Sequence, residues 1–243
     1  MTIKNSKINK YYWKEYWTNF KPFRIDRVLF NDILEKFPYG ARDFIEIGGF
    51  PGIYSIYLKK NKNYNVTLLD YYIDRNILNQ MEVINDLPKN TVKIIEADFL
   101  EYMIDKRYDL VMSCGFVEHF NNLASILEKH ICLLKNDGLL FVAIPNFLGI
   151  NGWAQKFFDK KNYQAHNTKA MNLKYFKKIL TDSKLENIKI SYYGKPCVWL
   201  EESAPVNHLI RRLVRLISKL ISLVNLKNRI FSPYIIILAN KQD

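Results

Sequence analysis

Five apolar segments in the first 146 residues constrain the fold more than any other feature of this chain. Each is a nearly continuous apolar run and does not alternate apolar with polar positions. An alternating strand has one face in water, whereas a continuous apolar strand is covered on both faces, which is typical of parallel sheets. We therefore predict buried parallel strands at residues 43–49, 65–70, 91–98, 108–114 and 139–146.

Segments with helical spacing lie between these strands. Residues 53–60 and 75–86 follow the first and second strands. Residues 122–138 follow the fourth strand, and Asn136-Asp137-Gly138 is expected to end that helix. His130 falls on the polar side of this helix and is expected to face water. Strands that alternate with helices predict a doubly wound α/β fold, with helices on both faces of the sheet.

The pattern changes after residue 146. Residues 147–170 have no clean period and are expected to form a long loop with room for a short helix. A helix at 171–183 and a strand at 186–193 resume the alternation, and a final strand is expected near the end of the chain. Between them, residues 207–226 predict a long amphipathic helix.

The stretch FIEIGGFPG, residues 44–52, ends the first strand in a turn with three glycines. Gly48 and Gly52 allow a ligand to approach the backbone closely. In an open α/β sheet, ligands bind at the carboxyl ends of the strands. Acids mark three of these ends, namely Glu46, Asp70 and Asp98. A ligand surrounded by carboxylates is expected to be cationic and rich in hydroxyl groups rather than phosphorylated.

Two common nucleotide-binding motifs do not fit this turn. The dinucleotide fingerprint G-x-G-x-x-G, begun at Gly48, would need glycine where Phe50 and Ile53 stand. The phosphate-binding P-loop needs a Gly-Lys-Ser/Thr sequence that does not follow here. Pro51 also lacks the N–H group that a phosphate cradle would use. These mismatches argue against a nicotinamide-dependent dehydrogenase.

Taken together in this order, the motifs resemble the class I S-adenosylmethionine-dependent methyltransferases over roughly residues 10–195. The family's first motif, acid-x-Gly-x-Gly-x-Gly, is similar to residues 46–52. The stretches YDLVMSCGFVEHF and LLKNDGLLFVAIPN resemble its fourth-strand and fifth-strand motifs, and YYWKEYW resembles the aromatic N-terminal helix of many small-molecule members. The resemblance implies a Rossmann-like, seven-stranded, mostly parallel sheet with an antiparallel last strand.

The resemblance also implies S-adenosylmethionine as the cofactor. In the family, the acid after the second strand binds the ribose hydroxyls, which gives this role to Asp70. The acid after the third strand binds the adenine amino group, which gives that role to Asp98. The residues implied to bind the cofactor are Glu46, Gly48, Gly49, Gly52, Asp70, Tyr71, Asp98, Phe99, Cys114 and Gly115.

One residue departs from the family's first motif. Phe50 stands where the family has its middle glycine. Its side chain either crowds the methionine part of the cofactor or points away, because Gly49 shifts the local geometry. The first outcome would leave a protein that has lost catalysis.

Methyl transfer requires an aligned acceptor and, for a hydroxyl acceptor, the removal of one proton. Two histidines are the catalytic candidates. His119 follows the fourth strand, where it either acts as a general base or bonds Glu118 and holds the loop. His166 stands in the segment after the fifth strand, where acceptors usually enter. The residues expected to bind or line the acceptor site are Glu118, Asn146, Tyr163, Asn167, Trp199, Glu201 and Glu202. The sequence has no recognisable cluster of metal ligands, so no metal is expected.

The chain has a formal net charge of +12, concentrated at its two ends. Basic ends suit nucleic acid, an anionic membrane surface or a phosphorylated substrate, or they only keep the chain soluble. Nucleic acid is disfavoured, because residues 113–116 (Ser-Cys-Gly-Phe) do not match the Asn/Asp-Pro-Pro-aromatic motif of relatives that methylate bases. The predicted helix at 207–226 is basic and amphipathic, which indicates a membrane-surface element, a dimer contact or a helix packed on the sheet edge.

Similar basic, leucine-rich stretches occur in relatives that modify glycans and lipid-linked sugars. We therefore expect a methyltransferase of class EC 2.1.1 that O-methylates a small-molecule or saccharide acceptor: a surface glycan, a sugar nucleotide or a secondary metabolite, with polysaccharide biosynthesis as one setting. The alternatives are an RNA or other nucleic-acid methyltransferase and a catalytically inactive scaffold that binds S-adenosylmethionine.

The expected organisation is one domain over residues 1–243. It comprises a helical cap at 1–40, a cofactor-binding core at 41–146 and an acceptor-side half at 147–243. The three cysteines are widely spaced, which indicates a reducing compartment. No leader sequence or apolar run of spanning length is recognisable, so the expected location is cytoplasmic, with peripheral membrane contact left open.

Overall fold

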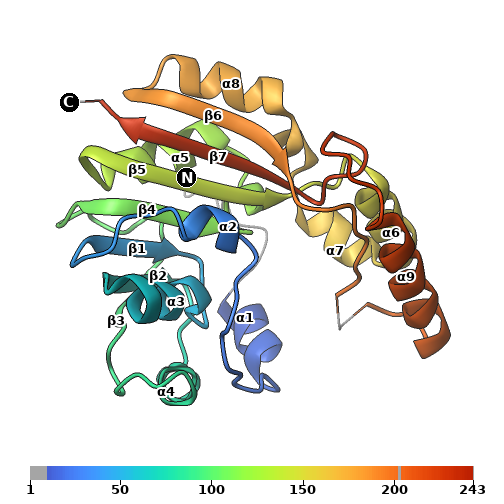
Figure 1. Ribbon diagram of the computed structural model, residues 1–243, viewed down its shortest axis with the longest axis horizontal. Helices are drawn as coiled ribbons and strands as arrows, with labels where there is room; N and C mark the ends of the chain where they lie inside the picture. Colours follow the sequence, from blue (N-terminus) through green and yellow to red (C-terminus); the bar gives the residue numbers. More distant parts are fainter. Residues whose placement is uncertain (1–9, 202–203, 243) are drawn as a thin grey trace.

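A single seven-stranded sheet runs through the computed structural model, which describes residues 10–201 and 204–242 (Figure 1). The strand order is β3-β2-β1-β4-β5-β7-β6. β7 pairs antiparallel with both β5 and β6, and the remaining neighbours pair in parallel. The strands are β1 (Asp43–Ile47), β2 (Asn65–Asp70), β3 (Lys93–Glu96), β4 (Tyr108–Cys114), β5 (Leu134–Pro145), β6 (Leu185–Tyr193) and β7 (Tyr234–Lys241).

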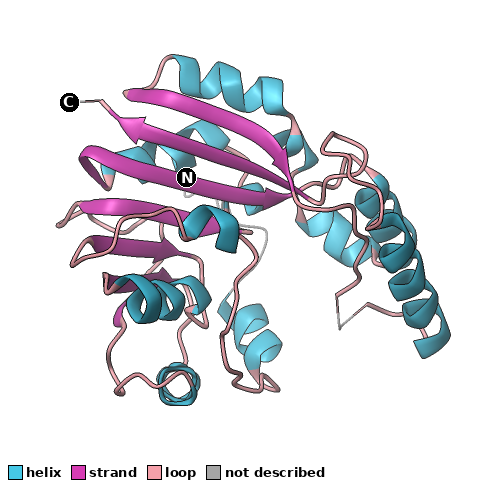
Figure 2. Cartoon of the chain, viewed as in Figure 1, coloured by secondary structure: helices cyan, strands magenta, loops and turns pink. Residues whose placement is uncertain are grey.

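Helices cover both faces of this sheet (Figure 2). Consecutive residues of β1 supply the two faces, because Phe44 packs into one apolar core and Ile45 into the other. This double burial explains why the strands are continuous apolar runs. The helices are α1 (Lys10–Trp17), α2 (Asn31–Leu34), α3 (Ile53–Lys62), α4 (Arg75–Ile84), α5 (Leu123–Cys132), α6 (Ile150–Phe158), α7 (Lys160–Ala165), α8 (Leu173–Thr181) and α9 (His208–Ile221), with 3-10 turns η1 (Val117–His119) and η2 (Thr168–Met171).

Each core has its own helices. Leu34 of α2, Ile56 of α3 and Met81 of α4 pack into the core that contains Phe44. Leu127 of α5 and Phe176 of α8 pack into the core that contains Ile45. The predicted doubly wound, mostly parallel sheet with an antiparallel last strand is confirmed.

Two predicted boundaries in this region were wrong. Helix α5 ends at Cys132, not at Asn136-Asp137-Gly138. β5 already begins at Leu134, which pairs with Tyr108 of β4 before a register shift. Asp137 has a φ of +59°, a conformation that Asn and Asp adopt more readily than other side chains. The Asn-Asp-Gly sequence therefore marks an irregularity inside a strand and not the end of a helix.

Residues 147–170 are more helical than predicted. They contain α6, α7 and the start of η2. The expectation of a long loop was wrong because these helices are short and their apolar pattern is broken: the polar Asn151 is buried, whereas the apolar Trp153 is exposed. Helix α9 ends at Ile221 and not at residue 226.

His130 is fully buried, which contradicts the expectation that it faces water. Its Nδ1 lies 2.7 Å from the carbonyl oxygen of Ile126, and its Nε2 lies 3.1 Å from the Ser113 hydroxyl of β4. Burial lowers the pKa of His130 to about 4. This histidine is therefore a neutral link between α5 and the sheet.

The carboxyl ends of β1, β4 and β5 point toward one edge of the sheet. Figure 1 shows α1 beyond this edge on the side of β1 and β2, and α6, α7 and α9 beyond it on the side of β5 and β6. Segments from both halves of the chain therefore meet around the strand ends. Within residues 10–201 and 204–242, no helix has the length and apolar character needed to span a bilayer.

Candidate functional site

The glycine turn connects β1 to α3 with a backbone that a side chain would obstruct. Gly48 has a φ of +63°, and a Cβ built there would lie 2.1 Å from Cδ2 of Phe116. The Gly48 N–H donates to the carbonyl oxygen of Leu69 on β2, with an N to O distance of 2.8 Å. Gly52, also left-handed, precedes the first turn of α3. The turn is thus held against β2 while Phe116 packs directly over Gly48.

Glu46 is buried against this turn, and its burial argues against direct contact with the cofactor. Its side chain is 2% exposed, and Oε2 accepts hydrogen bonds from both the N–H and the hydroxyl of Ser55, each at 2.7 Å. Its carboxyl group also lies against Gly49, where a Cβ would come within 2.2 Å of Oε1. Burial raises the pKa of Glu46 to about 7, although the bonds from Ser55 oppose that shift. Glu46 therefore positions the turn and the start of α3.

Asp70 connects the end of β2 to the same turn. Its Oδ2 accepts a hydrogen bond from the Phe50 N–H at 3.0 Å, and its Oδ1 accepts one from the Tyr72 N–H at 3.3 Å. Burial raises the pKa of Asp70 to about 6, while these N–H groups lower it in part. Each carboxylate oxygen has about two acceptor positions. Asp70 can therefore hold the turn and still accept hydrogen bonds from a pair of ligand hydroxyls.

The other predicted cofactor residues lie at the neighbouring strand ends. Asp98, after β3, is partly buried, and its Oδ1 accepts the Leu100 N–H at 2.9 Å. Phe99 is 3% exposed and packs edge-on against Phe116, with ring centroids 5.5 Å apart. Tyr71 is exposed at the end of β2. Phe99 is therefore a buried residue that packs against Phe116 and supports the site, whereas Asp98 and Tyr71 remain candidates for ligand contact.

Cys114 and Gly115 follow β4 at the same edge. The Tyr54 hydroxyl donates to the Cys114 sulfur at 3.7 Å. Burial raises the pKa of Cys114 to about 12, which keeps it a thiol near neutral pH. Gly115 is exposed and has a φ of +69°. The backbone of this segment is therefore accessible, while the Cys114 side chain is engaged with α3.

Phe50, the departure from the family motif, is buried in an aromatic cluster. It is 5% exposed, and its ring packs edge-on against Trp17 of α1 and Tyr72, with centroid distances of 5.1 and 6.1 Å. Helix α1 reaches across the same edge of the sheet, because Lys10 forms an ion pair with Glu96 at the end of β3. Phe50 therefore connects the turn to the N-terminal helix.

The predicted catalytic residues come together although about 47 positions separate them. One side-chain ligand atom of each of Glu118, His119 and His166 lies within 4.8 Å of the others. The two imidazole centroids are 4.7 Å apart. Glu118 is fully buried, and burial raises its pKa to about 8. His119 and His166 are partly exposed. The sequence contains the Glu118-His119 pair and His166 as separate features, and only the fold shows that they lie together.

An aromatic wall, which we define as Phe147, Tyr163, Trp199 and Tyr234, borders this cluster. The Phe147 ring lies 4.7 Å from the ring of His166, 6.2 Å from that of Tyr163 and 6.2 Å from that of Trp199. Trp199 and Tyr234 stack at 5.5 Å. Tyr163 and Trp199 were predicted to bind the acceptor. Phe147, which follows β5, and Tyr234, which begins β7, were not predicted, because apolar residues at strand ends are normally core residues. Planar faces of this kind suit an apolar or saccharide ring.

Asn146 does not fit the predicted role of binding substrate. It is fully buried, and its Nδ2 donates to the carbonyl oxygens of Arg229 and Ser232, both at 2.8 Å. Its Oδ1 accepts the Leu148 N–H. The side chain joins the end of β5 to the segment before β7. Of the other acceptor candidates, Asn167 holds the η1 segment through the Phe120 carbonyl, Glu201 is partly buried, and Glu202 lies outside the described residues.

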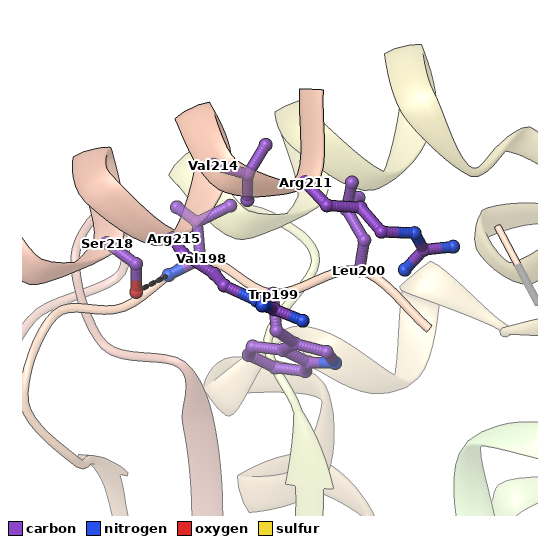
Figure 3. Close-up of a pocket in the computed structure, with 7 residues that line it drawn as sticks. All are labelled: Val198, Trp199, Leu200, Arg211, Val214, Arg215 and Ser218. Carbon is purple, nitrogen blue, oxygen red and sulfur yellow. Dashed lines mark hydrogen bonds between the residues drawn. The ribbon is translucent and has the colours of Figure 1, made fainter. Parts of the chain in front are cut away.

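A pocket lined in part by Trp199 lies between α9 and the segment after β6 (Figure 3). The Val198 N–H donates to the Ser218 hydroxyl of α9 at 3.0 Å, which closes one end. Arg211 donates to the carbonyl oxygens of Glu201 and Ala204. The hydrogen bonds around this pocket therefore attach α9 to the rest of the acceptor-side half. Its lining residues are Val198, Trp199, Leu200, Arg211, Val214, Arg215 and Ser218.

The donor and acceptor groups at the strand ends fit the cofactor that the resemblance implies. Asp70 offers carboxylate oxygens to a pair of hydroxyls, and Asp98 offers another acceptor one strand away. The turn holds no lysine, and Pro51 has no N–H, so a phosphate would find few partners. A cationic nucleoside without phosphate matches this chemistry.

Comparisons with known proteins agree with this assessment. A family model described as a methyltransferase domain matches residues 23–190. A probable (S)-tetrahydroprotoberberine N-methyltransferase 2 from Papaver bracteatum is 35% identical over 101 residues, which cover 40% of this chain and 27% of the relative. The match thus spans about a quarter of that relative's length.

Solved structures share the fold. A SAM-dependent methyltransferase from Archaeoglobus fulgidus superposes with a TM-score of 0.54 at 22% identity, over 83% of this chain and 87% of the other. Phosphoethanolamine N-methyltransferase 2 from Haemonchus contortus, in complex with S-adenosyl-L-methionine, gives a TM-score of 0.59 at 12% identity, over 85% of this chain and 50% of the other.

Proposed function

The chain belongs to the methyltransferase domain family, and on this premise we propose that it transfers the methyl group of S-adenosylmethionine to a hydroxyl of a small molecule or saccharide. When bound, the cofactor supplies a methyl group already activated by the adjacent sulfonium. The protein then has to bind the nucleoside, align the acceptor and assist the loss of one proton.

Asp70 and the glycine turn form the cofactor side of this proposal. The Asp70 carboxylate accepts the ribose hydroxyls while the Phe50 and Tyr72 N–H groups hold it in place. Asp98 accepts from the adenine amino group. Gly115 is exposed and presents backbone without a side chain, which allows the rest of the cofactor to approach the end of β4, whereas the Phe116 ring covers Gly48.

The pairing of His119 with His166 is the observation that carries the acceptor side. Their rings are 4.7 Å apart and lie next to the aromatic wall. A hydroxyl held between two imidazoles has a neighbouring group that can assist removal of its proton near neutral pH. Tyr163 and Trp199, which are partly exposed members of the aromatic wall, offer apolar faces on which a sugar or phenol ring can pack, while Phe147 is buried behind His166.

Methyl transfer to nitrogen is the second candidate, because the names of two relatives describe N-methyltransferases. An amine acceptor would use the same cluster: Glu118 would attract the ammonium form, and a neighbouring histidine would take its proton so that the nitrogen lone pair can attack the methyl carbon. Transfer to a nucleic acid and a non-catalytic scaffold role are the remaining alternatives.

A screen for methyl transfer by mass spectrometry tests the proposal. Purified protein and S-adenosylmethionine are incubated with sugar nucleotides, oligosaccharides, phenols, primary amines and a short RNA. We expect a mass increase of one methyl group on a hydroxyl compound. His119→Asn should lower kcat by about 100-fold or more, since a positioned base contributes roughly 10²–10⁴. His208→Ala, on the exposed start of α9, is the matched control and should retain full activity.

The other outcomes count against the hydroxyl acceptor. Transfer to amines alone would establish the second candidate in its place. Transfer to RNA alone would support the nucleic-acid alternative. Tight binding of S-adenosylhomocysteine without transfer to any compound class would favour the scaffold.

A further inference from the structure

We propose that Glu118, His119 and His166 bind one divalent metal ion, with two imidazole nitrogens and one carboxylate as its protein ligands. The three ligand atoms lie within 4.8 Å of one another, at the carboxyl end of β4 and beside the aromatic wall. They come from two segments, η1 and the residue that follows α7.

The Glu118 carboxyl group is the strongest argument for a cation site. It is fully buried, and across the described part of the chain neither Oε1 nor Oε2 has a hydrogen-bond partner. A buried carboxylate without a partner is costly, and buried charges are normally paired or coordinate metals. The exposed Gly115 backbone lies beside this carboxyl group, because a Cβ added there would lie 3.8 Å from Oε1.

The two histidines are oriented as metal ligands usually are. Nδ1 of His119 lies 3.3 Å from the Ala165 carbonyl oxygen, and Nδ1 of His166 lies 2.7 Å from the Asn162 carbonyl oxygen. A ring that donates from Nδ1 to a carbonyl has its lone pair on Nε2. Histidines bound to metals typically show this arrangement, in which the outer hydrogen bond fixes the tautomer and the ring orientation.

Backbone contacts fix the two segments to each other. The Asn167 N–H donates to the Glu118 carbonyl oxygen at 2.7 Å, and Asn167 Nδ2 donates to the Phe120 carbonyl oxygen at 3.0 Å. Together with the His119 contact to Ala165, these bonds join η1 to residues 165–167. The ligand set is therefore held in place by the fold and not by flexible side chains meeting at a surface.

The ligand types indicate a borderline transition metal such as Zn²⁺, Mn²⁺ or Fe²⁺. Ligand bonds of about 2.0–2.2 Å place two ligands at most roughly 4.4 Å apart, so the cluster has to contract slightly when the ion binds. Three protein ligands leave at least one coordination position open, as in catalytic sites. That position faces the partly exposed side of the cluster, where the acceptor would lie.

The role of the ion rests on the proposed function. An acceptor hydroxyl in the open position would become more acidic, because a divalent cation stabilises the oxyanion. The hydroxyl proton then passes to water, and the oxygen forms a bond to the methyl carbon as the carbon–sulfur bond breaks. The sulfur keeps the electron pair and leaves as S-adenosylhomocysteine. With the ion bound, the imidazoles would assist proton loss through the metal; without it, one of them would take the proton directly, as in the proposed function.

The test uses full-length protein stripped with a chelator and titrated with Co²⁺ and Zn²⁺. Co²⁺ absorption bands report nitrogen and oxygen ligation, and calorimetry gives the Zn²⁺ stoichiometry and affinity. We expect one ion per chain with micromolar or better affinity. Glu118→Gln and His166→Ala should each weaken Zn²⁺ binding by about 100-fold or more, because even outer-shell partners account for about 10–100-fold. His208→Ala is the control and should bind normally.

Two results would overturn the metal site: no binding to the wild type, or binding that Glu118→Gln and His166→Ala leave unchanged. Circular dichroism of each variant verifies that it is folded. S-adenosylhomocysteine binding is measured on the same samples, so failure of the cofactor site is distinguished from failure of the metal site. A protein that binds Zn²⁺ through these residues but not S-adenosylhomocysteine would keep the metal site and refute the proposed function.

Helix α9 carries a second, independent inference: we propose that it docks on an anionic lipid bilayer. Among the described residues, one side of α9 packs on the protein, through Ile210, Val214 and Ile221, against the apolar cluster that includes Ala154 of α6. A second side is apolar and exposed, with Leu209, Leu213 and Leu220 at 62%, 54% and 58%. This exposed stripe consists of Leu209, Leu213, Leu216, Ile217 and Leu220.

A basic stripe runs beside the apolar one. Arg212, Arg215 and Lys219 are exposed, and their helical spacing places them next to the leucines on the side away from α6. An exposed apolar stripe next to cations matches the boundary between lipid chains and anionic headgroups. A second copy of this chain would bring two basic stripes together, which makes the bilayer the better partner.

Vesicle co-sedimentation tests this inference with phosphatidylcholine vesicles and with vesicles that contain about a third phosphatidylglycerol. We expect binding to the anionic vesicles that salt weakens. Replacing Arg212, Arg215 and Lys219 by Gln should lower it by about tenfold or more, and Leu213→Gln with Leu220→Gln should abolish it. The matched control replaces the exposed Lys174, Lys177 and Lys178 of α8 by Gln and should bind as the wild type. Equal binding to neutral and anionic vesicles would overturn this inference. It would also be overturned if the protein bound neither kind of vesicle and formed a dimer that dissociates when the leucines are replaced.

Discussion

Phe50→Ala tests whether the residue that departs from the family motif is a structural anchor or a defect in the cofactor site. The Phe50 side chain is 5% exposed and packs edge-on against Trp17 and Tyr72. Truncating a buried Phe costs about 3–5 kcal/mol. Because part of this contact is with the short helix α1, we expect a loss at the low end, about 3 kcal/mol of unfolding free energy.

Urea denaturation followed by circular dichroism measures this loss. With a slope of about 3 kcal/mol per M for a chain of this size, the transition midpoint should fall by about 1 M. Phe23→Ala is the control, because Phe23 is 43% exposed, and its midpoint should shift by about a third of that or less.

Calorimetry with S-adenosylhomocysteine completes the test. The Phe50 N–H, which orients Asp70, is a backbone group that the substitution keeps. We therefore expect no gain in affinity. A tenfold gain in affinity with an unchanged urea midpoint would refute the reasoning, since it would mean that the Phe50 ring occupies cofactor space and contributes little to packing.

Three further predictions concern the turn and its carboxylates. Because burial raises the pKa of Asp70 to about 6, S-adenosylhomocysteine affinity should fall about tenfold from pH 7 to pH 5 as the carboxylate becomes protonated, and Asp70→Asn should remove that dependence in calorimetry. Burial raises the pKa of Glu46 to about 7 in the folded protein, so its contribution to stability is present below the unfolded pKa and is lost as pH rises through about 7. In urea titrations, the unfolding free energy of Glu46→Gln relative to the wild type should therefore increase between pH 5 and pH 8, by at most about 3 kcal/mol; a difference that stays constant with pH would contradict this. Gly48→Ala should collide with the Phe116 ring and lower S-adenosylhomocysteine affinity at least ~10-fold, whereas Gly40→Ala, at a positive φ with nothing within 4 Å, should lose stability only.

Much of the fold could be predicted because its signals are local. The strands at 65–70 and 108–114 match β2 and β4 residue for residue, since continuous apolar runs bounded by polar residues have few other interpretations. The glycine turn and Asp70 were found for the same reason. By contrast, Asn136-Asp137-Gly138 has the composition of a helix stop, and only the pairing of Leu134 with Tyr108 shows that it lies within a strand.

The acceptor side depended on tertiary contacts that the sequence does not encode locally. His119 and His166 were separate candidates, and no spacing rule indicates that the loop after α7 returns to η1. His130 was misjudged because its partner, the Ser113 hydroxyl, belongs to a strand 17 residues earlier. Asn146 directly follows β5, where a ligand-binding residue is expected, yet its side chain donates a hydrogen bond to the Arg229 carbonyl oxygen.

The most direct test of the central claim is a calorimetric titration with S-adenosylhomocysteine, with NAD as the control ligand, on the wild type and Asp70→Ala. The account predicts micromolar binding of S-adenosylhomocysteine and none of NAD. It also predicts a loss of about 1–3 kcal/mol in Asp70→Ala, the cost of removing a charged hydrogen-bond partner. No binding by the wild type, or equal binding by Asp70→Ala, would contradict it.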